Sequence, residues 1–219
     1  MANKVCTIVG AGPGLSLAVA RRFAREGYSI SLLARRAEAL DEYAAQLRQA
    51  GTTVAGFAAN VADDESLKMA LASSKSQLGA TDVLVYNAAV MQPCEPSVLS
   101  SATLLNDFKV NVAGALLAAQ DVLTDMRAAK SGTILFTGGG LALHPSAAYT
   151  SLTIGKSAVR SLAYCLGEEL EPEGIHVATV TIAGTIKAGD PRFDPELVAE
   201  NYWQLHVQPR DQWQREIVY

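Results

Sequence analysis

The sequence predicts an α/β protein in which a single parallel sheet carries helices on both faces. Strand-like apolar segments alternate with amphipathic helical segments along most of the chain, a pattern typical of a doubly wound sheet. A glycine-rich turn joins the first strand-like segment to the first helical one. Because the chain has 219 residues and no visible linker or repeat, we expect one domain spanning residues 1–219.

The predicted elements follow one another in a regular order. Strand-like segments cover residues 4–9, 29–34, 53–58, 82–86, 133–137 and 176–182. Helical segments cover residues 15–26, 37–49, 64–77, about 102–129 and 149–169, and Gly27 and Gly51 are suited to end the first two. The segment 187–219 is irregular apart from a helix over 194–205. Strands separated by helices predict right-handed crossovers.

Composition excludes several classes of protein. Hydrophobic residues make up 49% and charged residues 18% of the chain, which is typical of a globular protein. A formal net charge of −4 without a basic block argues against nucleic-acid binding. The cysteines (Cys6, Cys94 and Cys165) form no CxxC pair, so neither a disulfide framework nor a metal site is predicted. No segment resembles a membrane span or a signal peptide, so we expect a cytoplasmic protein.

The turn after the first strand has the composition of a phosphate-binding loop. It reads Gly10-Ala11-Gly12-Pro13-Gly14-Leu15-Ser16 and leads into a helix. Glycines there let the backbone approach a pyrophosphate, and the helix N-terminus offers free amide groups. A strand, this turn and a helix in succession predict a Rossmann-like, dinucleotide-binding domain.

The end of the second strand bears on the choice of dinucleotide. The segment is Ala34-Arg35-Arg36, with no acidic residue to accept hydrogen bonds from the ribose 2′-hydroxyl of NAD. Two arginines can instead pair with a 2′-phosphate, which favours NADP (NADPH) as the cofactor. The alternative is that these arginines form a solvated start of the next helix.

The chain resembles the short-chain dehydrogenase/reductase superfamily over residues 4 to about 186. The matching motifs are Gly10-x-x-x-Gly14-Leu15, Asn60-Val61, Tyr86-Asn87-Ala88-Ala89, Val110-Asn111-Val112-Ala113-Gly114, Lys156-Ser157-Ala158, Glu171–Val177 and Ala183-Gly184-Thr185-Ile186. The resemblance implies cofactor binding by Gly10, Pro13, Gly14, Leu15, Arg35, Arg36, Asn60, Val61, Asn87, Ala88, Ala89, Lys156, Gly184, Thr185 and Ile186. The family's final strand is reduced here to residues 216–219 at most.

The family's catalytic set of Asn, Ser, Tyr and Lys is matched only in part. Asn111 and Lys156 correspond to the asparagine and the lysine. The serine position holds Gly139 and the tyrosine position holds Leu152. Since leucine has no ionisable proton, the usual acid–base step cannot take place at that position.

Tyr149 is a candidate replacement for the missing tyrosine. It lies seven residues before Lys156, a spacing that resembles the enoyl-acyl-carrier-protein reductase branch of the superfamily. Ser16-Leu17-Ala18 and Ala183-Gly184-Thr185-Ile186 also resemble that branch. The catalytic candidates are therefore Lys156, Asn111 and Tyr149, and the alternative for Tyr149 is that it caps or packs the start of the helix. His144 is a further candidate acid or base, with a solvated loop position as its alternative.

The tail and the long helices carry further hypotheses. Segment 187–219 is expected to be the substrate-covering and C-terminal segment, and Tyr202, Trp203 and His206 share a face of its helix. That face either contacts substrate or packs in the core or in a dimer. The resemblance also implies a homodimer or homotetramer formed by helices 102–129 and 149–169. The small residues Ala113, Gly114, Ala118 and Ala163 would suit close packing there or against the sheet.

Three functions remain open at this stage. The first is an NADP(H)-dependent oxidoreductase that transfers hydride to or from a small carbonyl or conjugated enone substrate with a modified acid–base set. The second is a catalytically inactive NADP-binding protein with a regulatory or partner role. The third is non-redox chemistry on the same scaffold, such as isomerisation or elimination.

Overall fold

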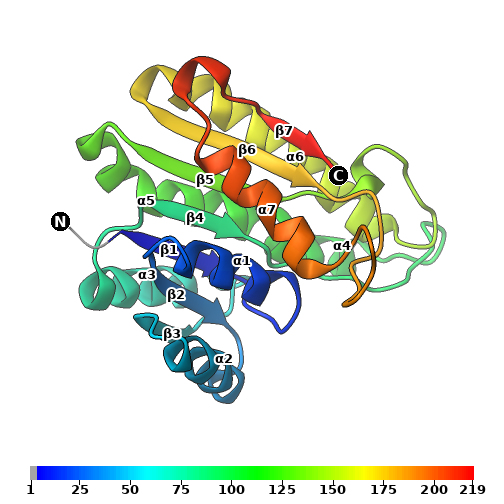
Figure 1. The fold of residues 1–219 in the computed structure, drawn as a ribbon. Helices are drawn as coiled ribbons and strands as arrows, with labels where there is room; N and C mark the ends of the chain where they lie inside the picture. Colours follow the sequence, from blue (N-terminus) through cyan, green and yellow to red (C-terminus); the bar gives the residue numbers. More distant parts are fainter. Residues whose placement is uncertain (1–3) are drawn as a thin grey trace.

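A computed structural model describes residues 4–219 as a seven-stranded parallel sheet (Figure 1). The strands lie in the order β3-β2-β1-β4-β5-β6-β7. Their bounds are β1 Val5–Val9, β2 Ser29–Ala34, β3 Val54–Ala58, β4 Val83–Tyr86, β5 Gly132–Thr137, β6 Ile175–Thr181 and β7 Glu216–Val218. The order reverses between β1 and β4, which is where open α/β sheets bind ligands.

Helices cover both faces of this sheet. One face packs against α1 (Leu15–Ala24), α2 (Ala37–Gln49) and α7 (Pro195–His206). The other packs against α3 (Asp64–Leu78), α5 (Gly114–Ala129) and α6 (Thr150–Leu170), with α4 (Ser101–Phe108) leading into α5. In Figure 1, α1 and α7 lie in front of the sheet and α5 lies behind it. The predicted fold class, a Rossmann-like doubly wound sheet, is confirmed.

The central strands are buried along their whole length because both of their faces are covered. Every residue of β1, β4 and β6 is buried. Parallel strands sandwiched between helix layers have this continuous pattern instead of an alternation of apolar and polar residues. The carboxyl ends of these strands therefore form a rigid edge on which a site can be built.

Two predicted elements differ in detail from those observed. The long helix predicted over 102–129 contains a π-helical segment at Lys109–Ala113, between α4 and α5. The remnant of a final strand forms β7, which pairs in parallel with β6 as the seventh strand. Gly114, Ala118 and Ala163 are buried toward the sheet, so these small residues allow the helices to pack on it, whereas Ala113 is exposed.

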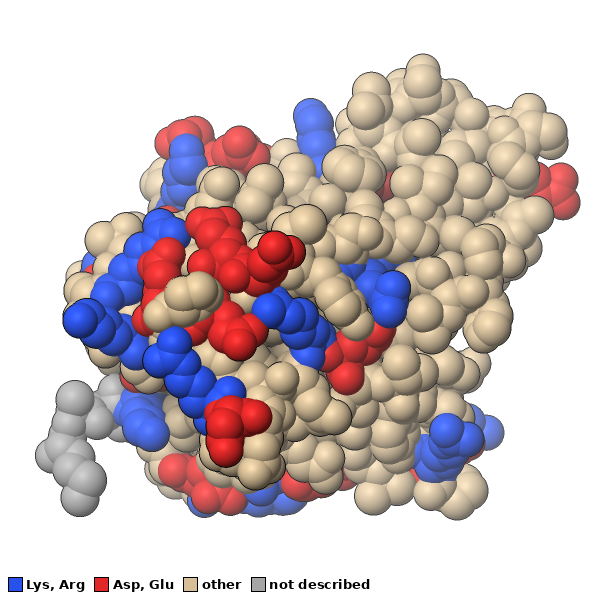
Figure 2. Space-filling view, turned by 90° about the horizontal axis from the view of Figure 1, so that it is seen from above, with Lys and Arg blue, Asp and Glu red and all other residues tan. Residues whose placement is uncertain are grey.

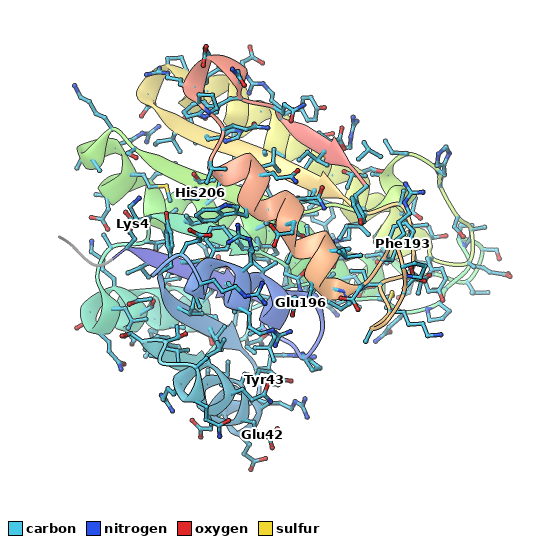
Figure 3. All side chains as sticks on the ribbon, viewed as in Figure 1. Lys4, Glu42, Tyr43, Phe193, Glu196 and His206 are labelled. Atoms are coloured by element: carbon cyan, nitrogen blue, oxygen red, sulfur yellow. The ribbon has the colours of Figure 1, made fainter. Side chains whose placement is uncertain are left out.

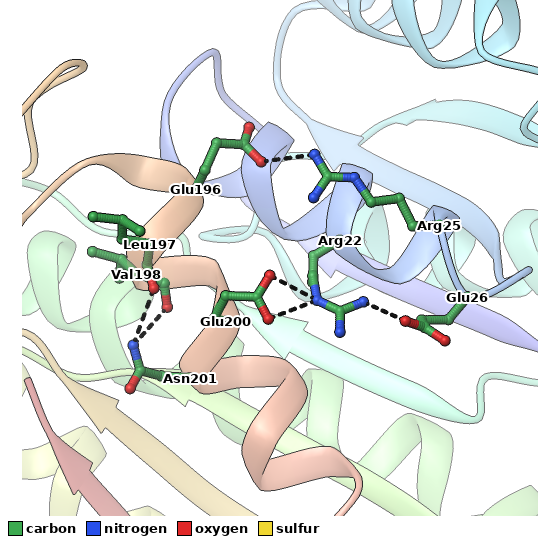
Figure 4. Close-up of polar contacts among 8 residues, drawn as sticks. All are labelled: Arg22, Arg25, Glu26, Glu196, Leu197, Val198, Glu200 and Asn201. Carbon is green, nitrogen blue, oxygen red and sulfur yellow. Dashed lines mark hydrogen bonds and ion pairs between the residues drawn. The ribbon is translucent and has the colours of Figure 1, made fainter.

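Helix α7 packs along α1. Figure 4 shows Glu196 paired with Arg25, and Arg22 paired with Glu200 and Glu26. On the sheet side, Tyr202 is fully buried and its hydroxyl lies 2.7 Å from the hydroxyl of Thr137. The core-packing interpretation of this helix face is therefore the one observed.

The other two aromatic residues of that face pack in the same layer. Trp203 and His206 join a ring cluster with Phe23 and Tyr28. His206, labelled in Figure 3, has Nε2 2.6 Å from the Tyr28 hydroxyl and Nδ1 2.9 Å from that of Thr133. The substrate-contact alternative for Trp203 and His206 is not supported, because these contacts use the side chains to hold α7 on the sheet.

Charges on the surface are intermingled. Figure 2 shows lysines and arginines lying beside aspartates and glutamates on the face seen from above, with a large uncharged area next to them. Ion pairs such as Arg127–Glu173 and Arg160–Glu216 join oppositely charged side chains elsewhere along the chain as well as between α1 and α7. Within residues 4–219, no helix has the length and apolar character needed to cross a membrane. No cluster of metal-ligating side chains occurs in that range either.

Candidate active site

The turn after β1 is built around Gly10. Its φ of 89° is in the left-handed region that favours glycine. A methyl group added there would lie 2.5 Å from the Cα atom of Ala88, at the end of β4. The amides of Gly10 and Ala11 both donate to the Leu33 carbonyl on β2 at 2.9 Å. One glycine thus draws together the carboxyl ends of three strands.

A partly buried hydrogen-bond network supports this turn. The Ser16 hydroxyl donates to the Gly10 carbonyl at 2.8 Å and accepts from the Asn87 amide Nδ2 at 2.8 Å. Ser16 stands where the family usually has its third glycine. Sequence reasoning noted this departure but did not link it to Asn87, 71 positions away.

A cavity of about 450 Å³ opens beside the turn. Its lining comes from the ends of β1, β2, β3 and β4 and the following loops: Gly10, Ala11, Ala34, Arg35, Ala59, Asn60, Val61, Asn87, Ala88, Ala89, Val90, Met91, Gln92 and Val110. Methyl groups added at Gly12 and Gly14 would meet nothing within 4 Å, so the backbone there is open to a ligand. The amide groups at the start of α1 lie at the same turn. These residues fit a dinucleotide.

Arg35 and Arg36 are exposed after β2, and Arg35 lines the cavity. Neither forms an ion pair with a carboxylate of residues 4–219, so both remain available to an anionic ligand. Asn60 uses its side-chain oxygen to accept from the Ala62 amide at 3.2 Å, which holds the loop after β3 in place. The structure thus brings the arginines and this loop to one rim of the cavity.

Asn111 lies inside the π-helical segment and is buried. Its side-chain oxygen accepts from the Val90 amide at 2.7 Å, which ties the segment to the loop after β4. Its Nδ2 is buried without a hydrogen-bond partner in residues 4–219. Gly155 of α6 allows this approach, since a methyl group there would lie 2.7 Å from the Asn111 Cβ atom.

Lys156 lies on α6 with its ammonium group at the end of β5. Nζ donates to the Thr137 carbonyl at 2.6 Å. Burial lowers the pKa of Lys156 to about 8. A methyl group added to Gly139 would lie 3.5 Å from three carbon atoms of the Lys156 side chain, so the stem passes directly over this glycine.

The two positions that the sequence predicts to correspond to the family's serine and tyrosine, Gly139 and Leu152, carry no hydroxyl group. Leu152 is buried one helical turn before Lys156 and Gly139 carries no side chain. The residue next to Leu152, Ser151, donates to the buried carboxylate of Asp107 at 2.6 Å, a contact that links α6 to α4. This pair was not foreseen, because it joins residues 44 positions apart.

Tyr149 stands immediately before the first residue of α6. It forms an isolated parallel bridge with Cys94, in which the Thr150 amide donates to the Cys94 carbonyl. The Tyr149 hydroxyl has no hydrogen-bond partner within residues 4–219. His144 is exposed in the preceding loop. The backbone position of Tyr149 is thus held firmly, whereas its hydroxyl is not engaged.

The loop after β6 carries Gly184, Thr185 and Ile186. The ring of Phe193 lies on Gly184, so closely that no side chain would fit there. The Lys187 amide donates to the Phe193 carbonyl at 3.0 Å and closes the loop on itself (Figure 3). In segment 187–219, the residues up to about 194 and Tyr219 stand near the carboxyl edge of the sheet, where Tyr219 is hydrogen-bonded through its backbone to Thr181 and Ala183 and packs edge-on against Phe193. Helix α7 lies between them in the chain and packs on α1.

The predicted cofactor residues fall into two groups. Gly10, Arg35, Asn60, Val61, Asn87, Ala88 and Ala89 line the cavity together. Pro13, Gly14 and Leu15 continue the same turn, while Lys156, Gly184, Thr185 and Ile186 follow β5 and β6 on the neighbouring side of the edge. Sequence reasoning missed Val90, Met91 and Gln92, whose loop carries no recognisable motif.

Comparisons with known proteins identify the family of the chain. The short chain dehydrogenase family matches residues 4–189. The chain is 28% identical over 179 residues (81% of its length) to human dehydrogenase/reductase SDR family member 4. It is 30% identical over 189 residues (85% of its length) to the human mitochondrial SDR family member 2. It spans 64% and 66% of these relatives.

Solved structures share the fold as well. A metagenomic short-chain oxidoreductase, solved in complex with NADP, superposes with a TM-score of 0.90 at 23% identity. The similarity covers 99% of this chain and 96% of that one. Since the family matches most of the described residues, from β1 to the loop after β6, this chain belongs to the short-chain dehydrogenase family.

Proposed function

We propose that this protein is an NADP(H)-dependent oxidoreductase that transfers hydride to or from a small carbonyl or conjugated enone substrate. The observation that carries the proposal is the cavity at the carboxyl ends of β1, β2 and β4, with Gly10 at its floor and Arg35 on its rim. Lys156 supports it by placing an ammonium group at the same edge. The NADP complex of the metagenomic relative supports the class of cofactor.

The residues that would hold the cofactor follow from their positions. The turn from Gly10 to Leu15 suits the pyrophosphate, because its amides and the start of α1 favour negative charge. Arg35 and Arg36 suit a 2′-phosphate, which selects NADP over NAD. Lys156 and the segment 184–186 suit the nicotinamide half. A bound nicotinamide supplies or accepts the hydride, and the protein supplies orientation and a proton.

The acid–base set is modified relative to the family pattern. Asn111 and Lys156 are retained, Gly139 and Leu152 are not, and Tyr149 is the candidate that sequence spacing suggests. Segment 187–219 would form the substrate-covering and C-terminal part of a single domain over 1–219. We further propose a homodimer or homotetramer acting in the cytoplasm.

A second candidate function is NADP binding without redox chemistry. The buried, apolar Leu152 and the bare Gly139 favour it, because they remove two polar groups that polarise a carbonyl. The test combines NADPH binding, followed by nucleotide fluorescence, with NADPH consumption in the presence of ketones, aldehydes and enones. Consumption with any probe supports the oxidoreductase, whereas tight binding without consumption favours the binding protein. Product formation with no change in nicotinamide absorbance would indicate isomerisation or elimination instead.

A further inference from the structure

The Lys156 side chain lies beside one of the two positions at which the family's hydroxyl groups are expected but absent, and its ammonium group lies at the end of β5. Its stem runs over Gly139, and the three nearest atoms to a methyl group built there all belong to Lys156. Leu152, one turn earlier on α6, contributes only a buried apolar side chain. No serine or tyrosine hydroxyl therefore stands between Lys156 and a substrate at these two positions.

The hydrogen bonds of Lys156 leave most of its donors unused. An ammonium group has three N–H donors and no acceptor. Within residues 4–219, Nζ donates only to the Thr137 carbonyl, at 2.6 Å, and pairs with no carboxylate. The half-buried ammonium group of Lys156 therefore has two N–H donors that no acceptor of residues 4–219 uses. A ribose hydroxyl of the cofactor can take one, which leaves one for a substrate oxygen.

We propose that Lys156 is itself the proton-transfer group, giving its proton to the substrate oxygen in reduction and removing it in oxidation. The inference rests on the proposed oxidoreductase function. In reduction, the carbonyl carbon gains the hydride of the reduced dinucleotide and the C=O π electrons move to oxygen. That oxygen forms an O–H bond as an N–H bond of Lys156 breaks, and the neutral amine then regains a proton from water.

The surroundings of Lys156 suit this role. Burial is the cause that lowers its pKa to about 8, so the group can release a proton near neutral pH. The charged or titratable side chains on the elements packed around it are Asp107 on α4, Lys109 in the π-helical segment, His144 and Tyr149 before α6, Arg160, Tyr164, Cys165, Glu168 and Glu169 on α6, Glu171 and Glu173 directly after α6, His176 on β6 and Glu216 on β7. Asp107 is bound to Ser151, and Arg160 is bound to Glu216. None of them contributes to the pKa shift of Lys156.

Lys156→Arg separates proton transfer from cofactor binding. Arginine keeps the charge and the donors, but its pKa of roughly 12 or more prevents release of a proton near neutral pH. We expect the dissociation constant of NADPH, measured by fluorescence, to change by no more than about threefold, while turnover of benzil or cyclohexenone falls about 100-fold or more. Tyr149→Phe, measured in the same assays, tests the alternative donor, since abolished turnover in that variant would assign the proton to Tyr149. Lys68→Arg, on the exposed face of α3, serves as the matched control.

The pH profile provides the second readout. Reduction needs the ammonium form, so its kcat/KM should be constant below about pH 8 and fall above it. Oxidation of the corresponding alcohol needs the amine, so its rate should rise through the same pH. NMR of isotopically labelled lysine in the protein without nucleotide should show one resonance titrating near pH 8 that Lys156→Arg removes.

The outcomes separate this inference from the function on which it rests. If Lys156→Arg keeps turnover and the high-pH decline, or if Tyr149→Phe abolishes them, the proton comes from elsewhere and the inference is wrong, while the oxidoreductase stands. If the unsubstituted protein binds NADPH but turns over no probe, the oxidoreductase proposal and this inference fail together.

Discussion

At the residue scale, single small side chains decide the shape of the cofactor turn. Gly10 combines a positive φ with an approach to Ala88 that no side chain would permit. Ser16 leaves the turn open, because its hydroxyl donates a hydrogen bond to the Gly10 carbonyl and accepts one from Asn87. The same glycine-rich motif therefore contains one position that tolerates no substitution and one that has accepted a polar side chain.

Gly10→Ala tests the first of these positions. Strain at a positive φ and overlap with Ala88 should together lower the free energy of unfolding by roughly 2–4 kcal/mol. Urea unfolding followed by circular dichroism measures it. Gly12→Ala is the matched control, since it has open space around it and should change stability by less than about 1 kcal/mol. Equal effects at the two positions would contradict this account.

Arg35→Ala tests the preference for NADP. Loss of charge-assisted hydrogen bonds to a 2′-phosphate, worth roughly 1.5–3 kcal/mol, should weaken NADPH binding about 10- to 100-fold. Binding of NADH should change by less than about twofold, since it has no such phosphate. Fluorescence titration with both nucleotides measures the two constants, and Arg25→Ala on α1 is the control. Equal losses of affinity for NADPH and NADH would show that Arg35 does not contact the 2′-phosphate.

At the scale of elements, two helices are placed by contacts that local sequence does not specify. The π-helical turn between α4 and α5 brings Asn111 to the Val90 amide. Helix α7 is held by Tyr202 and His206, whose polar atoms reach Thr137 and Thr133 on β5. One aromatic face that resembled a substrate surface is thus the inner face of a packed helix.

His206 should make the docking of α7 sensitive to pH. Its pKa is lowered from 6.5 to about 4, first by burial and then by the charges of Lys4 and His176. Between these pH values the unfolded chain binds the proton and the folded protein does not, so stability falls as pH drops from about 6.5 to about 4. The loss from this group is on the order of 3 kcal/mol and is absent above about pH 6.5.

Urea unfolding at a series of pH values measures this loss. His206→Gln should flatten the decline between about pH 6.5 and 4, although it also lowers stability overall by disturbing the contacts with Tyr28 and Thr133. His176, whose pKa burial also lowers, is present in both proteins, so the difference between the curves reports His206 alone. His144→Gln, at an exposed position, should leave the curve unchanged. A decline as steep in His206→Gln as in the original protein would refute the assignment.

At the scale of the whole molecule, the order of strands creates the site. Because β1 and β4 are neighbours, their following loops diverge to opposite sides and leave a cavity between them. The outward faces of α5 and α6 carry exposed apolar residues, among them Leu116 and Ile154. These faces are the surfaces that the proposed dimer or tetramer would bury.

Substitution on those helices tests the proposed assembly. Leu116→Arg combined with Ile154→Arg should convert the oligomer into monomers, because charged side chains are costly to bury without partners. Light scattering after gel filtration measures the mass, and circular dichroism checks the fold. Leu197→Arg, exposed on α7 of the opposite layer, should leave the mass unchanged. A protein that is already monomeric at micromolar concentration would refute the proposal.

The sequence alone determined the alternation of strands and helices and the glycine turn, and it predicted the roles of Asn111 and Lys156 and the loss of serine and tyrosine at Gly139 and Leu152. These features are local, since each depends only on residues within one strand, turn or helix. The tertiary structure alone decided the partners: Lys156 with Thr137, Ser16 with Asn87, and His206 with Tyr28, separated by 19, 71 and 178 positions. Such pairs form because closure of the sheet and its helix layers brings distant segments together, and no local pattern encodes which atoms then meet.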